Sequence, residues 1–214
     1  MRVLEHEQNL GPSAAGNTAM RAARGEYIAF LDQDAYWMPE HLESLCAVLN
    51  SRKADLAYSD CCVFREMPSG EIELFPIETF EVKNPPKDLF RRNFISPSCA
   101  AITRQLMEKV GDFDQALWLV QDLDYWIHAA ALGFEIASTG EQTYYYRKSA
   151  GSLSAVPARM AECNGRIFER RSRCGILPES DIVARARATY VAAGKLYRRE
   201  NPPLRAACFI SRGR

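Results

Sequence analysis

The sequence predicts an α/β fold: a largely parallel or mixed sheet flanked by helices, followed by a helical extension. Up to about residue 150, apolar segments of strand length alternate with segments whose apolar residues recur at helical spacing. From Pro157 onward the periodicity is helical only. The charge divides in a similar place, because residues 1–158 hold 14 Lys and Arg against 22 Asp and Glu, whereas residues 159–214 hold 13 against 5. We therefore expect an acidic core at 1–155 and a basic helical extension at 156–214.

The first half of the chain contains two helix signals and several strand signals. Ser13 is a candidate N-cap for a helix that Gly25 would end. The apolar run 27–31 has the length of a strand, and Pro39 is a suitable first residue for the next helix. Further strands are expected at 55–64 and 71–75, separated by a turn at 68–70.

The second half continues the alternation and then becomes helical. The clearest element is a helix at 121–132, which Gly133 would end. Ser180 is a candidate N-cap in the basic extension. The other expected elements are helices at 87–92 and 103–110 and strands at 98–102, 134–138 and 143–147.

Composition excludes several classes of protein. The 214 residues carry 27 basic and 27 acidic side chains, so the bulk charge argues against a strongly basic nucleic-acid binder. No apolar run reaches the roughly 18–20 residues that span a bilayer, and the first residues lack the apolar core of a signal peptide. The seven cysteines are odd in number and show no CxxC spacing, which favours reduced thiols in a cytoplasmic protein.

The strongest local signal is Asp32-Gln33-Asp34, which directly follows the apolar run 27–31. In open α/β sheets, ligands bind outside the carboxyl ends of the strands. Two carboxylates there could hold a divalent cation that neutralises substrate phosphates. The tripeptide alone also fits a solvated turn, since Asp is common in turns.

Longer blocks support a more specific interpretation. Over roughly residues 8–155, in order and spacing, the chain closely resembles family 2 glycosyltransferases of the GT-A fold, which has a Rossmann-like mixed sheet. The blocks that carry this resemblance are Asn9-Leu10-Gly11 with the Ala-rich helix after it, RGEYIAFLDQDAYWMPEHLESL, Asn93–Ser98, ITRQLMEKVGDFDQAL, QDLDYWIHAAALGFEI, and Tyr145-Tyr146-Arg147 followed by Gly151-Ser152-Leu153-Ser154.

The resemblance implies roles for particular carboxylates. Asp32 would face the sugar nucleotide, and Asp34 would bind Mg²⁺ or Mn²⁺. Asp122 would be the general base that deprotonates the acceptor hydroxyl, in an inverting displacement at the anomeric carbon. By the same match, Asn9, Gly11, Asn17, Trp118 and Gln121 would bind substrate; Gln121 stands where the family has Glu.

The implied partners are a nucleotide-diphosphate sugar and a saccharide or lipid-linked acceptor, as in cell-envelope polysaccharide biosynthesis. The basic extension is expected either to touch an anionic membrane surface or to pair with the acidic core. Family members begin with strands that hold the nucleotide, and this sequence starts after them; we therefore expect a partial GT-A sheet.

Two alternatives to an active transferase remain open from the sequence. The chain could be a fragment or a non-catalytic remnant that acts as a binding module. A haloacid dehalogenase-like phosphohydrolase also places Asp-x-Asp after a strand, with Asp32 as nucleophile and Gly111-Asp112-Phe113-Asp114 as a later acidic motif.

Overall fold

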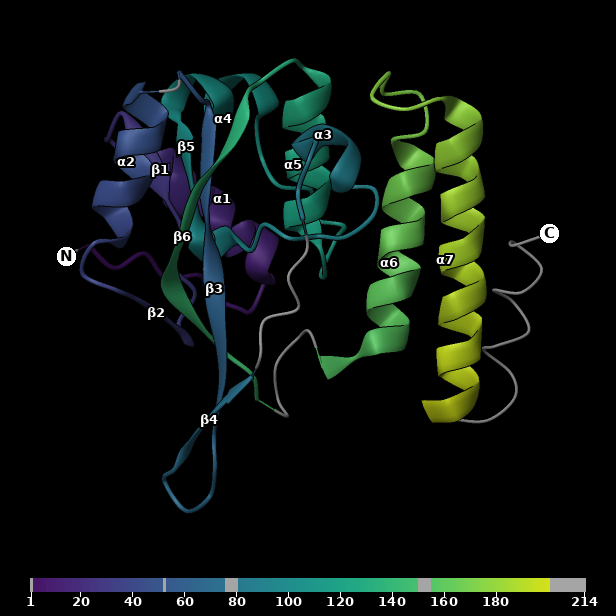
Figure 1. Cartoon of the computed structure of the whole chain (residues 1–214), viewed down its shortest axis with the longest axis horizontal. Coiled ribbons are helices and arrows are strands. Elements are labelled where there is room, and N and C mark those ends of the chain that lie inside the picture. Colours follow the sequence, from purple (N-terminus) through teal and green to yellow (C-terminus); the bar gives the residue numbers. More distant parts are fainter. Residues whose placement is uncertain (1, 52, 76–80, 150–154, 201–214) are drawn as a thin grey trace.

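A mixed β-sheet lies at the centre of the computed structural model, which describes residues 2–51, 53–75, 81–149 and 155–200 (Figure 1). The strand order is β1-β5-β3-β6-β2, and β4 pairs with β3 outside this path. Only β3 and β6 pair in parallel among the described strands; every other pairing is antiparallel. The strands are β1 (Tyr27–Ala29), β2 (Ala35–Trp37), β3 (Leu56–Glu66), β4 (Ile72–Phe75), β5 (Ala100–Thr103) and β6 (Ile136–Arg147).

Helices cover both faces of the sheet. On one face, α2 packs through Leu45 and Leu49 against the small residues Ala57 and Ala101. On the other, Met20 of α1, Leu106 of α4 and the apolar side of α5 join the main hydrophobic cluster. The helices are α1 (Pro12–Ala22), α2 (His41–Ser51), α3 (Pro85–Asp88), α4 (Arg104–Val110), α5 (Gln121–Ala131), α6 (Pro157–Arg170) and α7 (Glu179–Glu200), with a 3-10 turn at Pro97–Cys99.

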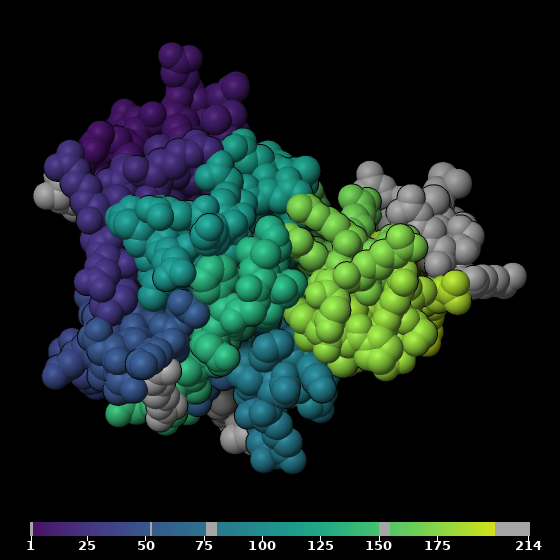
Figure 2. Space-filling model, turned by 90° about the horizontal axis from the view of Figure 1, so that it is seen from above, coloured from purple at the N-terminus to yellow at the C-terminus, as the bar shows by residue number. Residues whose placement is uncertain are grey.

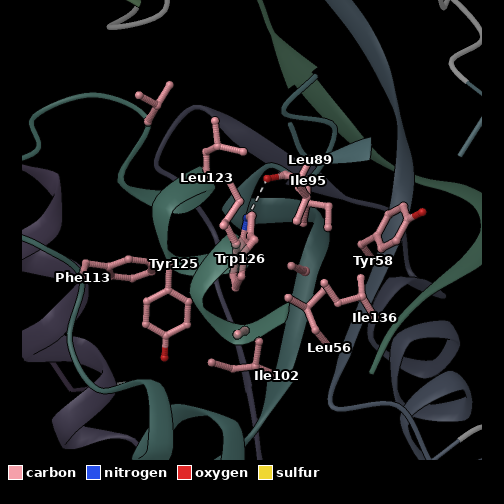
Figure 3. Close-up of a cluster of buried hydrophobic side chains, with 14 of the residues drawn as sticks. Leu56, Tyr58, Leu89, Ile95, Ile102, Phe113, Leu123, Tyr125, Trp126 and Ile136 are labelled. Atoms are coloured by element: carbon pink, nitrogen blue, oxygen red, sulfur yellow. Dashed lines mark hydrogen bonds between the residues drawn. The ribbon is translucent and has the colours of Figure 1, made fainter. Parts of the chain in front are cut away.

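Side chains alternate between the two faces of the sheet along β3, so the strand contributes to a hydrophobic cluster on each face. Leu56 and Tyr58 face the main cluster, whereas Ala57 between them faces α2. In the main cluster, Trp126 of α5 is fully buried and its indole Nε1 donates to the Ile95 carbonyl over 2.9 Å (Figure 3). That hydrogen bond fixes α5 relative to the segment that precedes β5.

The basic extension forms a helical hairpin. Helices α6 and α7 pack side by side, and the hairpin forms a lobe beside the sheet (Figures 1 and 2). Ile167 and Phe168 of α6 and Ile182 and Ala186 of α7 belong to the same hydrophobic cluster as the sheet. The hairpin therefore packs against the rest of the molecule through a continuous core. Among the described residues, no helix combines the length and apolarity that crossing a membrane requires.

Most expected elements are present, but helix α2 begins at His41 rather than at Pro39, and α3 covers Pro85–Asp88 rather than 87–92. Four further details differ. The cap of α1 is Gly11, because Ser13 donates instead to the Leu117 carbonyl over 2.8 Å. Ser180 lies inside the first turn of α7, which already begins at Glu179. The two strands expected at 134–138 and 143–147 are one continuous strand, β6, which follows β3 through register shifts. The segment after Asp34 forms strand β2, where no strand was expected, since its residues pair with the end of β6.

Candidate active site

The Asp32-Gln33-Asp34 turn links two strands that lie at opposite ends of the strand order, β1 and β2. Ser98, which is fully buried, holds it through one hydroxyl. The Asp32 backbone N–H donates to Ser98 Oγ over 2.9 Å, and Ser98 Oγ donates to Asp32 Oδ2 over 2.8 Å. The Trp37 indole donates to the Ser98 carbonyl over 2.7 Å. Because these contacts fix both ends of the turn, its carboxylates project from a defined backbone.

Asp122 lies in the first turn of α5 and is only 8% exposed. The residue before Gln121, Val120, has φ 54° and ψ 27°, a left-handed conformation that is costly for a β-branched side chain. Such a conformation persists only where the surrounding structure imposes it, and the Val120 side chain is itself buried at 5% exposed. Tertiary packing therefore sets the direction in which Asp122 enters the site.

The Asn93 side-chain amide forms a hydrogen bond with the Asp122 carboxylate. Asn93 Nδ2 donates to Asp122 Oδ2 over 2.9 Å, while Asn93 Oδ1 is buried without a hydrogen-bond partner. Burial raises the pKa of Asp122 to about 6, and the negative charge of Asp32 contributes to this rise. The Asn93 amide and the Leu123 N–H act in the opposite direction and lower that pKa.

Asp32 is affected in a similar way. Asp32 is an exposed residue, yet the protein around its carboxyl removes enough water to raise the pKa of that group, and the negative charge of Asp34 raises it further. The hydrogen bond from Ser98 lowers the same pKa. Asp32 and Asp122 thus lie close enough for their charges to interact, although 90 residues separate them in the sequence. The fold brings together the two carboxylates that the sequence singled out in different halves of the chain.

Trp118 and Gly11 form a second part of the site. Gly11 has φ 86°, and a Cβ added there would meet the Trp118 ring at 3.5 Å, so the indole lies directly over the start of α1. The Gly11 N–H donates to Asn9 Oδ1 over 2.9 Å. Trp118 remains 46% exposed, which leaves ring surface available to a ligand. Asn9 and Gly11 also line a groove of about 380 Å³ between residues 2–10 and α1.

The remaining predicted site residues have different environments. Asn17 is buried, and its amide makes two hydrogen bonds with the Phe113 backbone, which hold α1 against the segment before α5. Asp34 and Gln121 are half-buried. Within the described part of the chain, no three His, Cys, Asp or Glu side chains gather as a ready metal site. A cation at Asp34 would therefore take further oxygens from a bound substrate or water.

Several residues that shape the site were not predicted as site residues, although they lie in blocks that resemble the family. Asn93 and Ser98 belong to the block before β5, but nothing in the sequence pairs them with Asp122 and Asp32. Asp124 is 4% exposed and forms a two-pronged ion pair with Arg171, in which both N···O distances are 2.8 Å. The opposite charges of the core and the extension were the only hint of such a pair.

The model of the family described as Glycosyl transferase family 2 matches residues 1–111, which is more than half of the chain. The chain belongs to glycosyl transferase family 2. This membership removes the phosphohydrolase alternative, and it is consistent with a site built from strand-end carboxylates rather than around a nucleophilic Asp.

Two relatives illustrate the range of the family. The chain is 29% identical over 145 residues to the uncharacterized glycosyltransferase MJ1057 of Methanocaldococcus jannaschii, covering 67% of this chain and 49% of that protein. It is 24% identical over 149 residues to WfaP of Escherichia coli, a UDP-Glc:α-D-GlcNAc-diphosphoundecaprenol β-1,3-glucosyltransferase, covering 68% and 55%. The chain thus spans about half the length of these curated relatives.

Solved structures confirm the GT-A type of fold. Residues 1–349 of Staphylococcus aureus TarS, in complex with UDP-GlcNAc, match with a TM-score of 0.60 at 15% identity, covering 98% of this chain and 67% of that one. A second structure of the same TarS fragment matches with a TM-score of 0.58 at 17% identity, covering 87% and 53%. At such identity the likeness establishes the architecture and leaves the substrate open.

Proposed function

We propose that this family 2 chain transfers a sugar from a nucleotide-diphosphate donor to an acceptor hydroxyl with inversion, and that Asp122 is the general base. The observation that carries the proposal is the environment of Asp122. A buried carboxylate with a pKa of about 6 is still ionised at neutral pH, yet is a stronger base than an ordinary Asp. A hydroxyl is a weak nucleophile, so a base of this kind is what direct displacement needs.

In this mechanism, Asp122 accepts the hydroxyl proton as the acceptor oxygen attacks the anomeric carbon and the bond to the nucleotide diphosphate breaks. Asn93 holds the Asp122 carboxylate in position by donating a hydrogen bond to Oδ2. Ser98 fixes the Asp32 turn on the donor side. The exposed face of Trp118 provides a flat apolar surface suited to stacking on a sugar ring.

We also propose a divalent cation, Mg²⁺ or Mn²⁺, at Asp34. The residues present fit such an ion, because Mg²⁺ is commonly bound by one or two carboxylates together with substrate phosphates. When bound, the ion would stabilise the negative charge of the departing diphosphate. Asp34→Ala should weaken metal-dependent donor binding, and donor binding or transfer that needs no metal would contradict this site.

Binding and transfer assays test the main proposal together. Titration calorimetry with UDP-, GDP- and dTDP-sugars plus Mn²⁺ should reveal one preferred donor, and incubation with saccharide or diphospholipid acceptors should yield a product of inverted configuration. Asp122→Asn should retain donor binding and lose transfer. If correctly folded protein binds no donor, the chain is a non-catalytic binding module instead.

For the acceptor, we propose a growing cell-envelope polysaccharide or its lipid-linked precursor. WfaP is named for a diphosphoundecaprenol-linked acceptor, and ExoO of Rhizobium meliloti, 28% identical over 165 residues, is named for succinoglycan biosynthesis. A peripheral position on the cytoplasmic membrane surface would suit such an acceptor. Helix α7 supports it with an exposed basic face formed by Arg187, Lys195, Arg198 and Arg199.

Vesicle binding tests the membrane contact separately from catalysis. The wild-type chain should cosediment with vesicles that contain anionic lipid, and less so as salt is raised, because screening weakens surface electrostatics. Replacing Arg187 and Lys195 by Gln should weaken the association. Equal binding to neutral vesicles would contradict the electrostatic contact.

A further inference from the structure

Two segments carry the groups around Asp122, and both contact the α6–α7 hairpin. One is the first turn of α5, which bears Asp122 and Asp124. The other is the stretch 89–96, which bears Asn93 and receives the Trp126 hydrogen bond at Ile95. Neither segment belongs to the sheet, so strand pairing does not fix the Asn93–Asp122 contact.

The hairpin touches the first of these segments through Arg171. Its guanidinium Nε donates to Asp124 Oδ1, and a terminal guanidinium nitrogen donates to Asp124 Oδ2, each over 2.8 Å. The side chains of Asp124 and Arg171 are only 6% and 15% exposed, so little water screens the pair. A two-pronged Arg–carboxylate contact fixes orientation as well as distance. Asp124 lies in the same helical turn as Asp122, so its position constrains that of Asp122.

The hairpin touches the second segment at Phe90. Arg185 of α7 donates to the Phe90 carbonyl, and the Phe168 ring of α6 packs against the Phe90 ring with centroids 5.4 Å apart. Phe90 is fully buried and lies three residues before Asn93. One hairpin therefore contacts both segments that carry the Asn93–Asp122 hydrogen bond, α5 at Asp124 and the stretch 89–96 at Phe90.

The hairpin is itself well fixed internally. Gly165 of α6 lies against the Tyr190 ring of α7 so closely that an added Cβ would be 2.8 Å from it. The hydroxyls of Tyr190 and Tyr197 donate to Glu169 and Glu162, each over 2.8 Å. Contacts of this kind hold α6 and α7 together as one unit.

We propose that Arg171 is a positioning residue for catalysis: through Asp124, the α6–α7 hairpin holds the first turn of α5 in the orientation that presents Asp122. This inference rests on the proposed role of Asp122 as base. It gives the basic extension a function in the site itself, in addition to any contact with a membrane. Val120, directly before this turn, has a left-handed backbone that persists only where the surrounding structure holds it.

The test uses three variants and one control of the full chain. Arg171→Met removes the two-pronged pair and leaves Asp124 only its longer contact with Arg170, at 3.7 Å. Arg171→Lys keeps the charge but loses the two-pronged geometry, and Arg171→Met/Asp124→Leu removes both charges of the pair. The control is Arg173→Met, which removes an exposed arginine whose pair with Glu179 lies at the surface. Amide hydrogen exchange, donor binding and the kcat of transfer are measured for each.

In Arg171→Met we expect faster exchange at 89–96 and 121–127, with strands β3 and β5 unchanged. The kcat should fall on the order of 10²-fold, because small displacements of a reacting group can cost that much, while donor affinity stays near wild type. Arg171→Lys should be intermediate, and Arg173→Met should match wild type.

The double variant separates positioning from simple stability. Replacing a buried ion pair by apolar residues commonly restores stability. We expect restored stability together with fast exchange at 121–127 and low kcat. Recovery of wild-type exchange and kcat in the double variant would overturn the proposal, as would unchanged exchange in Arg171→Met. If the wild-type chain transfers no sugar, the proposed function fails while the exchange data still decide the positioning role.

Discussion

The first turn of α5 carries two buried carboxylates, Asp122 and Asp124, whose neighbours differ in charge. On the side of the sheet, Asp122 faces a neutral amide from Asn93 and the negative charge of Asp32, and the pKa of its carboxyl rises to about 6. On the side of the hairpin, Asp124 faces the full positive charge of Arg171. Two residues of the same type and similar burial therefore differ in what compensates their charge.

This difference separates a chemical role from a structural one. A carboxylate that lacks a cationic partner can take up a proton near neutral pH, as a general base must. A carboxylate that receives hydrogen bonds from two guanidinium nitrogens is held in one position. Four predictions test the contrast, from the largest expected effect to the smallest.

Asp122→Asn should lower kcat for sugar transfer by about 10²–10⁴-fold, since that is the usual contribution of a positioned general base. Donor affinity should remain near wild type, because the amide preserves the shape of the side chain. Asp112→Asn is the matched control, as Asp112 forms an exposed pair with Arg21. Full transfer activity in Asp122→Asn would remove Asp122 as the base.

Asp124→Asn should destabilise the fold by about 3–5 kcal/mol, because it leaves the Arg171 guanidinium buried without its charged partner. Urea unfolding measures the loss. Glu179→Gln breaks the exposed pair with Arg173 and should cost no more than about 1 kcal/mol. Equal losses in the two variants would show that burial does not distinguish the pairs.

Gly165→Ala should destabilise the hairpin by about 1–3 kcal/mol through overpacking against Tyr190, partly offset by the better helix propensity of Ala. In Gly165→Ala/Tyr190→Ala the tyrosine ring that would meet the new methyl group is gone. This double variant should therefore be little less stable than Tyr190→Ala. The free energies of unfolding of the double variant and of Tyr190→Ala are compared to isolate the contact between residue 165 and the Tyr190 ring. A Gly165→Ala protein more stable than wild type would show that the helices separate easily.

The smallest effect concerns pH. Transfer should decline as pH falls through about 6, where Asp122 becomes protonated. In Asn93→Ala this acid limb of kcat/KM should move to higher pH, because the hydrogen bond that lowers the pKa of Asp122 is gone. Asn50→Ala is the control, since Asn50 is exposed and bonds Tyr27 instead. An unmoved limb in Asn93→Ala would contradict its influence on Asp122.

The same pKa has a consequence for stability with a defined sign. The pKa of folded Asp122, about 6, lies above its ordinary value of 3.8, so protonation favours the folded state. This contribution is fully present below about pH 4 and is lost as pH rises through about 6. Asp122→Asn should abolish that part of the pH dependence.

Much of the architecture was readable from local signals. The helix at 121–132 and the strand at 55–64 were predicted within a few residues, because apolar periodicity and a terminal Gly act locally. The short β2 was missed, since three residues pair only because β6 lies beside them. Ser13 was expected to cap α1, but its hydroxyl donates instead to the carbonyl of Leu117, 104 residues away.

The sequence by itself determined the class of the chain. The resemblance of its blocks, in their order and spacing over roughly residues 8–155, is enough to place it among family 2 glycosyltransferases, because each block is a continuous run of the chain. Separation of charge between core and extension was equally visible in the sequence.

Only the tertiary structure decided which side chains meet. The Asn93–Asp122 contact, the hold of Ser98 on Asp32 and the Asp124–Arg171 pair join residues 29, 66 and 47 positions apart. Their partners are chosen by packing across the sheet and the hairpin, which no local pattern encodes. Burial, which also exists only after folding, then makes Asp122 a candidate base and leaves Asp124 a structural carboxylate.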